Sequence, residues 1–122
     1  MTLGFTETTN FMQYRDDYFV TDSAYSDVQQ VLLSNPKLGP VMRGCSGLWK
    51  IRWADPKRRK GKRDGLRIIY LYLPEFQRVV FLDVYDKDEA DDLTPEQRKE
   101  FAADAEKIRL EFQFQSFVWP KG

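Results

Sequence analysis

The residues best suited to chemistry in this chain are arginines and lysines, and they are concentrated in one segment. Between Arg43 and Arg67 there are ten basic residues, opposed only by Asp55 and Asp64, which leaves a net charge of +8. The run KRRKGKR at 57–63 carries six of these charges. Such a segment raises the local concentration of polyanions such as RNA or DNA. The alternative is a solvated loop that only keeps the protein soluble, but closely spaced like charges repel, so we favour anion binding.

The absence of histidine restricts the chemistry that these cations can serve. The sequence contains no histidine and one cysteine, Cys45. Ser-His-Asp triads, His-ligated metals and internal disulfides are therefore impossible within this chain, and a reducing cytoplasm is the expected setting. Arginine, lysine and tyrosine can still bind a phosphate, neutralise a phosphorane and align an attacking 2′-OH. We expect neither a metal nor another cofactor.

Three segments that would position the cations have the pattern of β-strands: residues 47–53, 65–73 and 78–85. The first alternates between polar and apolar residues, the second is an apolar run rich in β-formers, and the third again follows a period of two. The connections are short enough for an antiparallel meander. The period of two places four residues on one face of the third strand: Val79, Phe81, Asp83 and Tyr85.

The strand pattern also brings several cations to one side of the predicted sheet. Lys50 and Arg52 share a face of the first strand, and Trp49, Ile51 and Trp53 on its other face are expected to point inward. Arg67 lies within the second strand, and Lys87 lies just past the third. Because Arg67 interrupts an apolar run, its charge needs a partner if it is buried. Two interpretations stay open: a structural salt bridge, with Asp83 as the candidate acceptor, or a cation held on a rigid strand to meet a phosphate.

Helical patterns precede and follow the strands. An aromatic-rich helix is expected over residues 11–19, after Asn10 as a candidate cap. A second helix is expected over 23–34, where the pair Asn35–Pro36 ends it. Thr94 and Gln97 form a capping box that starts a helix over 94–111. The apolar side of this helix is expected to consist of Phe101, Ala105, Ile108 and Phe112. The aromatic residues of the first helix are interpreted as core rather than as a ligand site.

Together these elements predict one α+β domain over residues 1–122, with a small antiparallel β-sheet, two N-terminal helices and a C-terminal helix. No apolar run approaches the ~20 residues that span a bilayer, and the N-terminus lacks the pattern of a signal peptide. We therefore expect a cytoplasmic protein without a membrane partner. The apolar tail 112–122 is expected either to pack on the core of this domain or to dock a partner or a second copy of the chain.

Several of these segments, taken jointly, resemble a known family. The segments NPKLGPVMRGCSGLWKIRW, GKRDGLRIIYLYL and VVFLDVYDKDEADDLTPEQRKEF, spread over about residues 5–110, are similar to the HigB-type branch of the RelE superfamily of toxins. The resemblance implies a RelE-like fold and a ribosome-dependent mRNA endonuclease, the toxin of a type II toxin–antitoxin pair. Such a toxin cuts mRNA in the ribosomal A site by 2′-OH attack without a metal. Its partners are the ribosome, mRNA and an antitoxin with a helix-turn-helix domain.

The resemblance also implies roles for individual residues. Arg67 matches the strand arginine that stabilises the transition state. The other matched catalytic positions are Lys62, Arg63, Tyr85 and Lys87. The sequence departs from better-known RelE members at Asp88, where they have an arginine, and near Leu93, where they carry a catalytic tyrosine. The cations expected to bind RNA or the ribosome are Lys50, Arg52, Lys57, Arg58, Arg59 and Lys60.

Two other functions stay open from the sequence. One is a non-catalytic module of the same fold that binds RNA or the ribosome, which the basic segment would also serve. The other is a host-factor or phage-related interaction protein, for which the acidic segment 83–106 would matter most. That segment has ten acidic residues against three basic ones.

Overall fold

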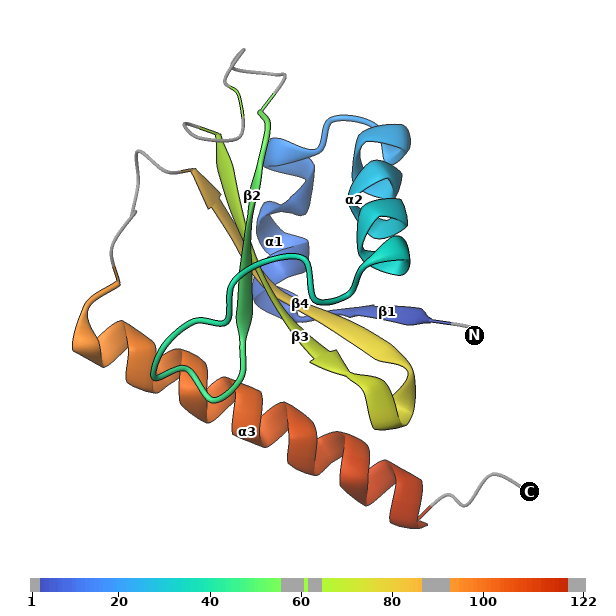
Figure 1. Cartoon of the computed structure of the whole chain (residues 1–122), viewed down its shortest axis with the longest axis vertical. Helices are drawn as coiled ribbons and strands as arrows, with labels where there is room; N and C mark the ends of the chain where they lie inside the picture. The colour runs from blue at the N-terminus through green and yellow to red at the C-terminus, as the bar shows by residue number, and fades with distance from the viewer. Residues whose placement is uncertain (1–2, 56–60, 62–64, 87–92, 119–122) are drawn as a thin grey trace.

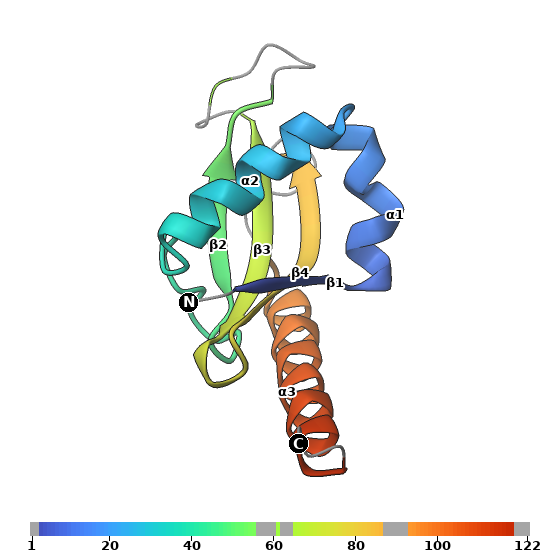
Figure 2. The same cartoon turned by 90° about the vertical axis from the view of Figure 1, so that its right-hand side faces the viewer.

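The structure is a computed structural model that describes residues 3–55, 61, 65–86 and 93–118. The described elements are β1 (Gly4–Glu7), α1 (Thr9–Tyr18), α2 (Asp22–Ser34), β2 (Trp49–Trp53), β3 (Leu66–Leu73), the short 3-10 helix η2 (Pro74–Phe76), β4 (Arg78–Asp86) and α3 (Pro95–Val118). Helices α1 and α2 cover one face of the sheet, and α3 crosses the other (Figures 1 and 2). The predicted α+β fold class is confirmed.

The sheet has the strand order β1-β4-β3-β2. Strands β2, β3 and β4 form the predicted antiparallel meander. Strand β1 was not predicted, and it pairs in parallel with β4, with Gly4 opposite Arg78. The sheet is therefore mixed rather than wholly antiparallel. Four residues are too few for a periodic pattern, which explains why the sequence did not reveal this edge strand.

Each face of the sheet carries its own hydrophobic cluster. The cluster under α1 and α2 contains Phe11, Val28 and Ile51, with Trp49 and Trp53 packed against it. The inward direction predicted for the apolar residues of β2 is therefore confirmed. The second cluster lies under α3 and includes the predicted apolar side of that helix: Phe101, Ala105, Ile108 and Phe112.

An irregularity in β4 changes the predicted faces of that strand. The register passes from Ile69 opposite Asp83 to Tyr70 opposite Phe81, so Leu82 is an extra residue. This is a β-bulge, which breaks the alternation of side chains between faces. Phe81 remains in the cluster under α1 and α2, whereas Tyr85 belongs to the cluster under α3. The expectation that Val79, Phe81, Asp83 and Tyr85 share one face is therefore wrong.

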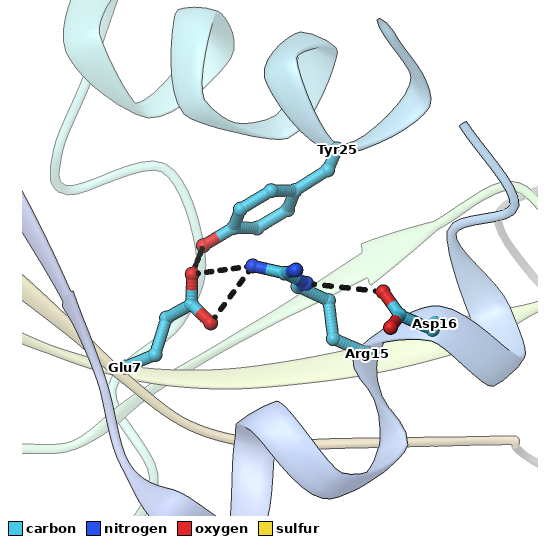
Figure 3. A network of polar contacts seen from close by, with 4 residues as sticks. All are labelled: Glu7, Arg15, Asp16 and Tyr25. Atoms are coloured by element: carbon cyan, nitrogen blue, oxygen red, sulfur yellow. Dashed lines mark hydrogen bonds and ion pairs between the residues drawn. The ribbon is translucent and has the colours of Figure 1, made fainter. Parts of the chain in front are cut away.

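A polar network ties β1 to both N-terminal helices (Figure 3). The Glu7 carboxylate accepts hydrogen bonds from the Tyr25 hydroxyl at 2.8 Å and from Arg15 at 2.9 Å. The guanidinium of Arg15 lies 5.1 Å from the centre of the Tyr25 ring, and its Nε donates to Asp16. Burial, together with the hydrogen bond to Glu7, raises the pKa of the Tyr25 hydroxyl. The network therefore fixes the short edge strand to α1 and α2.

The helix termini follow local capping signals. Helix α1 begins after Thr8, whose hydroxyl accepts a hydrogen bond from the Phe11 amide, so Thr8 and not Asn10 is its cap. At the start of α3, Thr94 and Gln97 exchange the two hydrogen bonds of the predicted capping box. Helix α3 continues to Val118, beyond the predicted end at 111. No helix in the described ranges is both long and apolar enough to cross a membrane.

The residues of the C-terminal tail that the structure describes divide between the two predicted interpretations. Phe112 packs against the second cluster, with its ring 5.7 Å from that of Phe76. Phe114 is 66% exposed, as is Leu110 one turn earlier at 63%. The positions 119–122 lie outside the described residues. Phe112 therefore completes the domain core, whereas Phe114 and Leu110 face solvent on another side of α3.

Replacing Tyr70 with phenylalanine is expected to lower the free energy of unfolding by about 1 kcal/mol at pH 7, because the partly buried Pro36 carbonyl loses its donor. Tyr70 is fully buried, and its hydroxyl donates to the Pro36 carbonyl at 2.7 Å. Burial raises the pKa of the Tyr70 hydroxyl to about 12. Its ordinary value is ~10, so this contribution is complete below pH ~10 and is lost as the pH rises toward the raised pKa.

Urea unfolding of the wild type and Tyr70→Phe at pH 7 and at pH 11 checks this prediction. The difference between the two proteins is expected to shrink at pH 11. A difference that stays constant or grows would contradict the assigned role of the hydroxyl.

Candidate functional site

Three of the predicted site residues form one row across the sheet. Arg52 of β2 is paired with Arg67 of β3, and Arg67 is paired with Tyr85 of β4. Side chains of directly paired residues point to the same face. Tyr85 belongs to the cluster under α3, so the row lies on the α3 face.

The neighbouring row contains Lys50, Ile69 and Asp83, which are paired in the same way. The two rows together place three cations, one carboxylate and one tyrosine on adjacent positions of a rigid sheet. Like charges directly opposite each other destabilise a sheet. The Arg52–Arg67 pair therefore favours an anion close to both side chains.

The cations of these rows differ in their access to solvent. Arg52 is exposed and Lys50 is half-buried, whereas Arg67 is only 2% exposed and Tyr85 7%. One guanidinium nitrogen of Arg67 donates to the Leu66 carbonyl at 3.2 Å. A ligand that approaches the sheet therefore meets Arg52 first, and Arg67 lies beneath the surface.

The structure keeps Asp83 as the candidate acceptor for the charge of Arg67. Asp83 is diagonal to Arg67 on the same face, at a separation where long side chains interact. Asp86 is also buried, but it is paired with Leu66 of the cluster under α1 and α2 and therefore points to the opposite face. The salt-bridge interpretation of Arg67 thus stays open with the partner that the sequence indicated.

Several predicted site residues cannot be placed relative to these rows. Leu93, noted as a departure from the RelE pattern, packs against the second cluster. The following residues lie outside the described part of the chain: Lys57, Arg58, Arg59, Lys60, Lys62, Arg63, Lys87 and Asp88.

A polar anchor that the sequence did not reveal connects α1 to the candidate site. The side-chain amide of Asn10 donates to Asp83 Oδ1 at 3.0 Å, and the backbone amide of Val84 donates to the same oxygen at 2.9 Å. Thr8 Oγ1 donates to the carbonyl of the extra residue Leu82 at 2.9 Å. Asn10 and Asp83 are 73 residues apart, so no local pattern could have paired them.

A pocket of about 450 Å³ lies beside this anchor, between the junction of β1 with α1 and the helix α3. Its floor is apolar and includes Val80 and Leu82, and its rim includes Asn10, Asp104 and Lys107. Among the described residues, none of the predicted site residues lines it. The pocket and the two rows are therefore separate features. Asn10 connects them, because it lines the pocket and donates to Asp83 of the second row.

The remaining reactive groups do not form a second centre in the described residues. Cys45 is fully buried in the second cluster. Within the described ranges, no three His, Cys, Asp or Glu side chains are grouped so that they could hold a metal ion.

A scan of the sequence against models of protein families finds no match.

Proposed function

We propose that this protein is a ribosome-dependent endoribonuclease of the RelE superfamily, HigB-type branch, acting as the cytoplasmic toxin of a type II toxin–antitoxin pair. The observation that carries the proposal is the row of Arg52, Arg67 and Tyr85 on one sheet face. In the sequence, Arg52 and Arg67 lie on either side of the basic run 57–63, whose charge suits a polyanionic substrate. The resemblance in sequence is the reason for proposing ribosome-bound mRNA as the substrate.

The chemistry that fits these residues is transfer of a phosphoryl group within the RNA strand. The 2′-OH attacks the adjacent phosphorus, and the leaving 5′-oxygen departs, which leaves a 2′,3′-cyclic phosphate. Guanidinium groups stabilise the charge that develops on the phosphate oxygens. Arg52 is the accessible first contact, whereas Arg67 reaches the phosphate only when the substrate displaces the protein atoms that now cover it.

The other residues have proposed roles that follow the resemblance. Lys62, Arg63 and Lys87 contribute further active-site charge, and Tyr85 lies at the end of the row. The cations at Lys50, Arg52, Lys57, Arg58, Arg59 and Lys60 hold RNA or the ribosome. The proposed protein partner is an antitoxin with a helix-turn-helix domain.

A second candidate function is a non-catalytic module that binds RNA or the ribosome. The 2% exposure of Arg67 favours it, because a catalytic cation must touch the reacting phosphate. In that case Arg67 would be a structural residue, and the exposed cations would account for binding.

Controlled expression with mapping of mRNA ends separates the two functions. Under the proposed function, induction stops translation, and new 5′-hydroxyl ends arise within coding sequences at the ribosomal A site. The same cleavage is expected with purified ribosomes and purified protein, while ribosome-free mRNA is cut weakly. Ribosome binding without new mRNA ends would instead support the binding module.

A further inference from the structure

We infer that Arg43 and Arg98 form a further binding site for the phosphates of single-stranded RNA, outside the row of Arg52, Arg67 and Tyr85. The inference takes RNA as the ligand from the proposed function, and it adds two residues that neither the sequence nor that proposal assigned. Together with two cations of β2 they form a surface that we call the β2 strip, which consists of Arg98, Arg43, Lys50 and Arg52.

The turn before β2 brings the two arginines together. The Met42 amide donates to the Leu48 carbonyl at 2.7 Å, so the chain folds back and Arg43 lies beside the start of β2. The guanidinium of Arg98, in the first turn of α3, donates to the Arg43 carbonyl at 2.7 Å. Figure 1 shows the segment before β2 crossing the N-terminal half of α3. Arg43 and Arg98 are therefore neighbours, although they are 55 positions apart in the sequence.

Further contacts with α3 hold this turn in place. Gly47 has a positive φ of +86°, and a Cβ there would lie 2.5 Å from a guanidinium nitrogen of Arg109. The hydroxyl of Ser46 accepts a hydrogen bond from Arg109 at 3.2 Å and donates one to Glu106. Because the turn is packed and bonded on α3, the exposed side chain of Arg43 starts from a fixed backbone.

The cations of the β2 strip have no counter-charge in the described part of the chain. Arg15 and Arg109 each form an ion pair with a carboxylate, whereas none of the four cations of the β2 strip does so within those residues. On α3, the positions three and four residues from Arg98 are all uncharged: Thr94, Pro95, Phe101 and Ala102. Neighbouring cations repel one another when no acid lies between them, so a bound polyanion stabilises this surface.

The length of the β2 strip suits a chain of phosphates better than a single anion. Lys50 and Arg52 lie two residues apart on the α3 face of β2, which is roughly 7 Å. Leu48, two residues before Lys50, is buried in the cluster under α3. Arg43 lies beside Leu48, and Leu48 is roughly 13 Å from Arg52 along the strand. No single phosphate contacts both ends of such a surface.

The β2 strip is continuous with the proposed reacting row, because Arg52 belongs to both. RNA with one phosphate at this row can therefore continue along Lys50 to the two arginines at α3. A guanidinium offers a planar pair of donors that fits two phosphate oxygens. The β2 strip thus holds nucleotides that flank the cleaved bond, and it contributes affinity rather than chemistry.

Fluorescence anisotropy with 2′-O-methyl RNA tests this inference, because RNA without a free 2′-OH binds but is not cut. The probes are a trinucleotide, which spans the row alone, and a strand of twelve nucleotides, which also spans the β2 strip. For the wild type, the binding constant of the longer strand is expected to fall more steeply with salt. Arg43→Ala and Arg98→Ala are each expected to reduce that slope by about 0.7, the value for one phosphate contact of a single strand. Neither variant should change binding of the trinucleotide.

Three variants serve as controls. Lys107→Ala removes an exposed cation of α3 that lines the pocket and lies outside the β2 strip, and it is expected to keep the wild-type slope. Arg98→Lys keeps the charge and is expected to restore the slope that Arg98→Ala loses. Arg43→Ala keeps the carbonyl that bonds to Arg98, so this variant decides if circular dichroism shows that Arg98→Ala does not fold.

The possible results separate this inference from the proposed function. Equal slopes of the wild type for the two probes, or wild-type slopes in folded Arg43→Ala and Arg98→Ala, overturn the β2 strip. Binding of poly-glutamate that depends on the two arginines as strongly as RNA binding does overturns RNA as the ligand. Cleavage of mRNA on ribosomes is measured on the same preparations. Wild-type protein that binds the longer strand through the β2 strip but cuts no mRNA overturns the proposed function alone.

Discussion

Arg67→Ala is expected to slow mRNA cleavage on ribosomes roughly 100- to 1,000-fold, because removal of one preorganised donor to a developing oxyanion has an effect of this size. Ribosome binding is expected to persist, since the exposed cations remain. In cells, the variant should no longer inhibit growth. The measurements are single-turnover cleavage and co-sedimentation with ribosomes, both made on the same preparation.

The burial of Arg67 makes a matched control necessary. The side chain is 2% exposed and bonds to the Leu66 carbonyl, so Arg67→Ala also removes packing within the sheet. Arg67→Lys keeps the charge and much of the stem but loses the planar fork that contacts two phosphate oxygens. We expect a folded lysine variant with greatly reduced cleavage. Thermal unfolding of both variants separates lost chemistry from lost structure.

Equal cleavage by wild type and Arg67→Ala would refute the active-site assignment. The same result would leave Arg67 as a buried structural cation and favour the binding module. A variant that loses cleavage and ribosome binding together would instead indicate that Arg67 contributes mainly to affinity.

Phe11→Ala is expected to lower the free energy of unfolding by ~3–5 kcal/mol, the usual effect of truncating a buried phenylalanine. Phe11 is fully buried, and its ring lies 4.9 Å from that of Phe81 and 5.9 Å from that of Tyr25. It therefore joins α1 to the sheet and to α2. A domain is typically stable by roughly 5–15 kcal/mol, so this one change removes a large part of the total.

The matched control for this prediction is another phenylalanine on the surface. Phe114 on α3 is 66% exposed, and surface substitutions usually change stability by less than ~0.5 kcal/mol. Urea unfolding of Phe11→Ala and Phe114→Ala in parallel gives the comparison. Similar destabilisation by the two changes would contradict the described core.

Elements with strong local signals could be predicted from the sequence. The alternation in WKIRW defined which residues of β2 face the core, and the capping box at Thr94 defined the start of α3. The Asn35–Pro36 pair marked the end of α2 at Ser34. In each case the information is carried by a few adjacent residues, because backbone hydrogen bonding and side-chain periodicity are local.

The features that the sequence did not reveal depend on distant contacts. Strand β1 exists because β4 offers it an edge, and the cap of α1 lies at Thr8 beside that edge. The bulge at Leu82 breaks the period of two that placed Asp83 with Phe81. At the candidate site, the residues of single strands could be predicted, but the contact between Asn10 and Asp83 could not.

The parallel pairing of β1 with β4 has a consequence for the order of folding. Thr8 is bonded to Leu82, a partner 74 residues further along the chain, whereas the meander of β2, β3 and β4 joins close neighbours. Closing a long loop before its contacts form is entropically unfavourable and slows folding. During synthesis, the N-terminal edge must therefore wait until β4 has been made. The side chain of Asn10 meets Asp83 only at that late stage, so a nascent chain lacks the assembled site until most of its length has been translated.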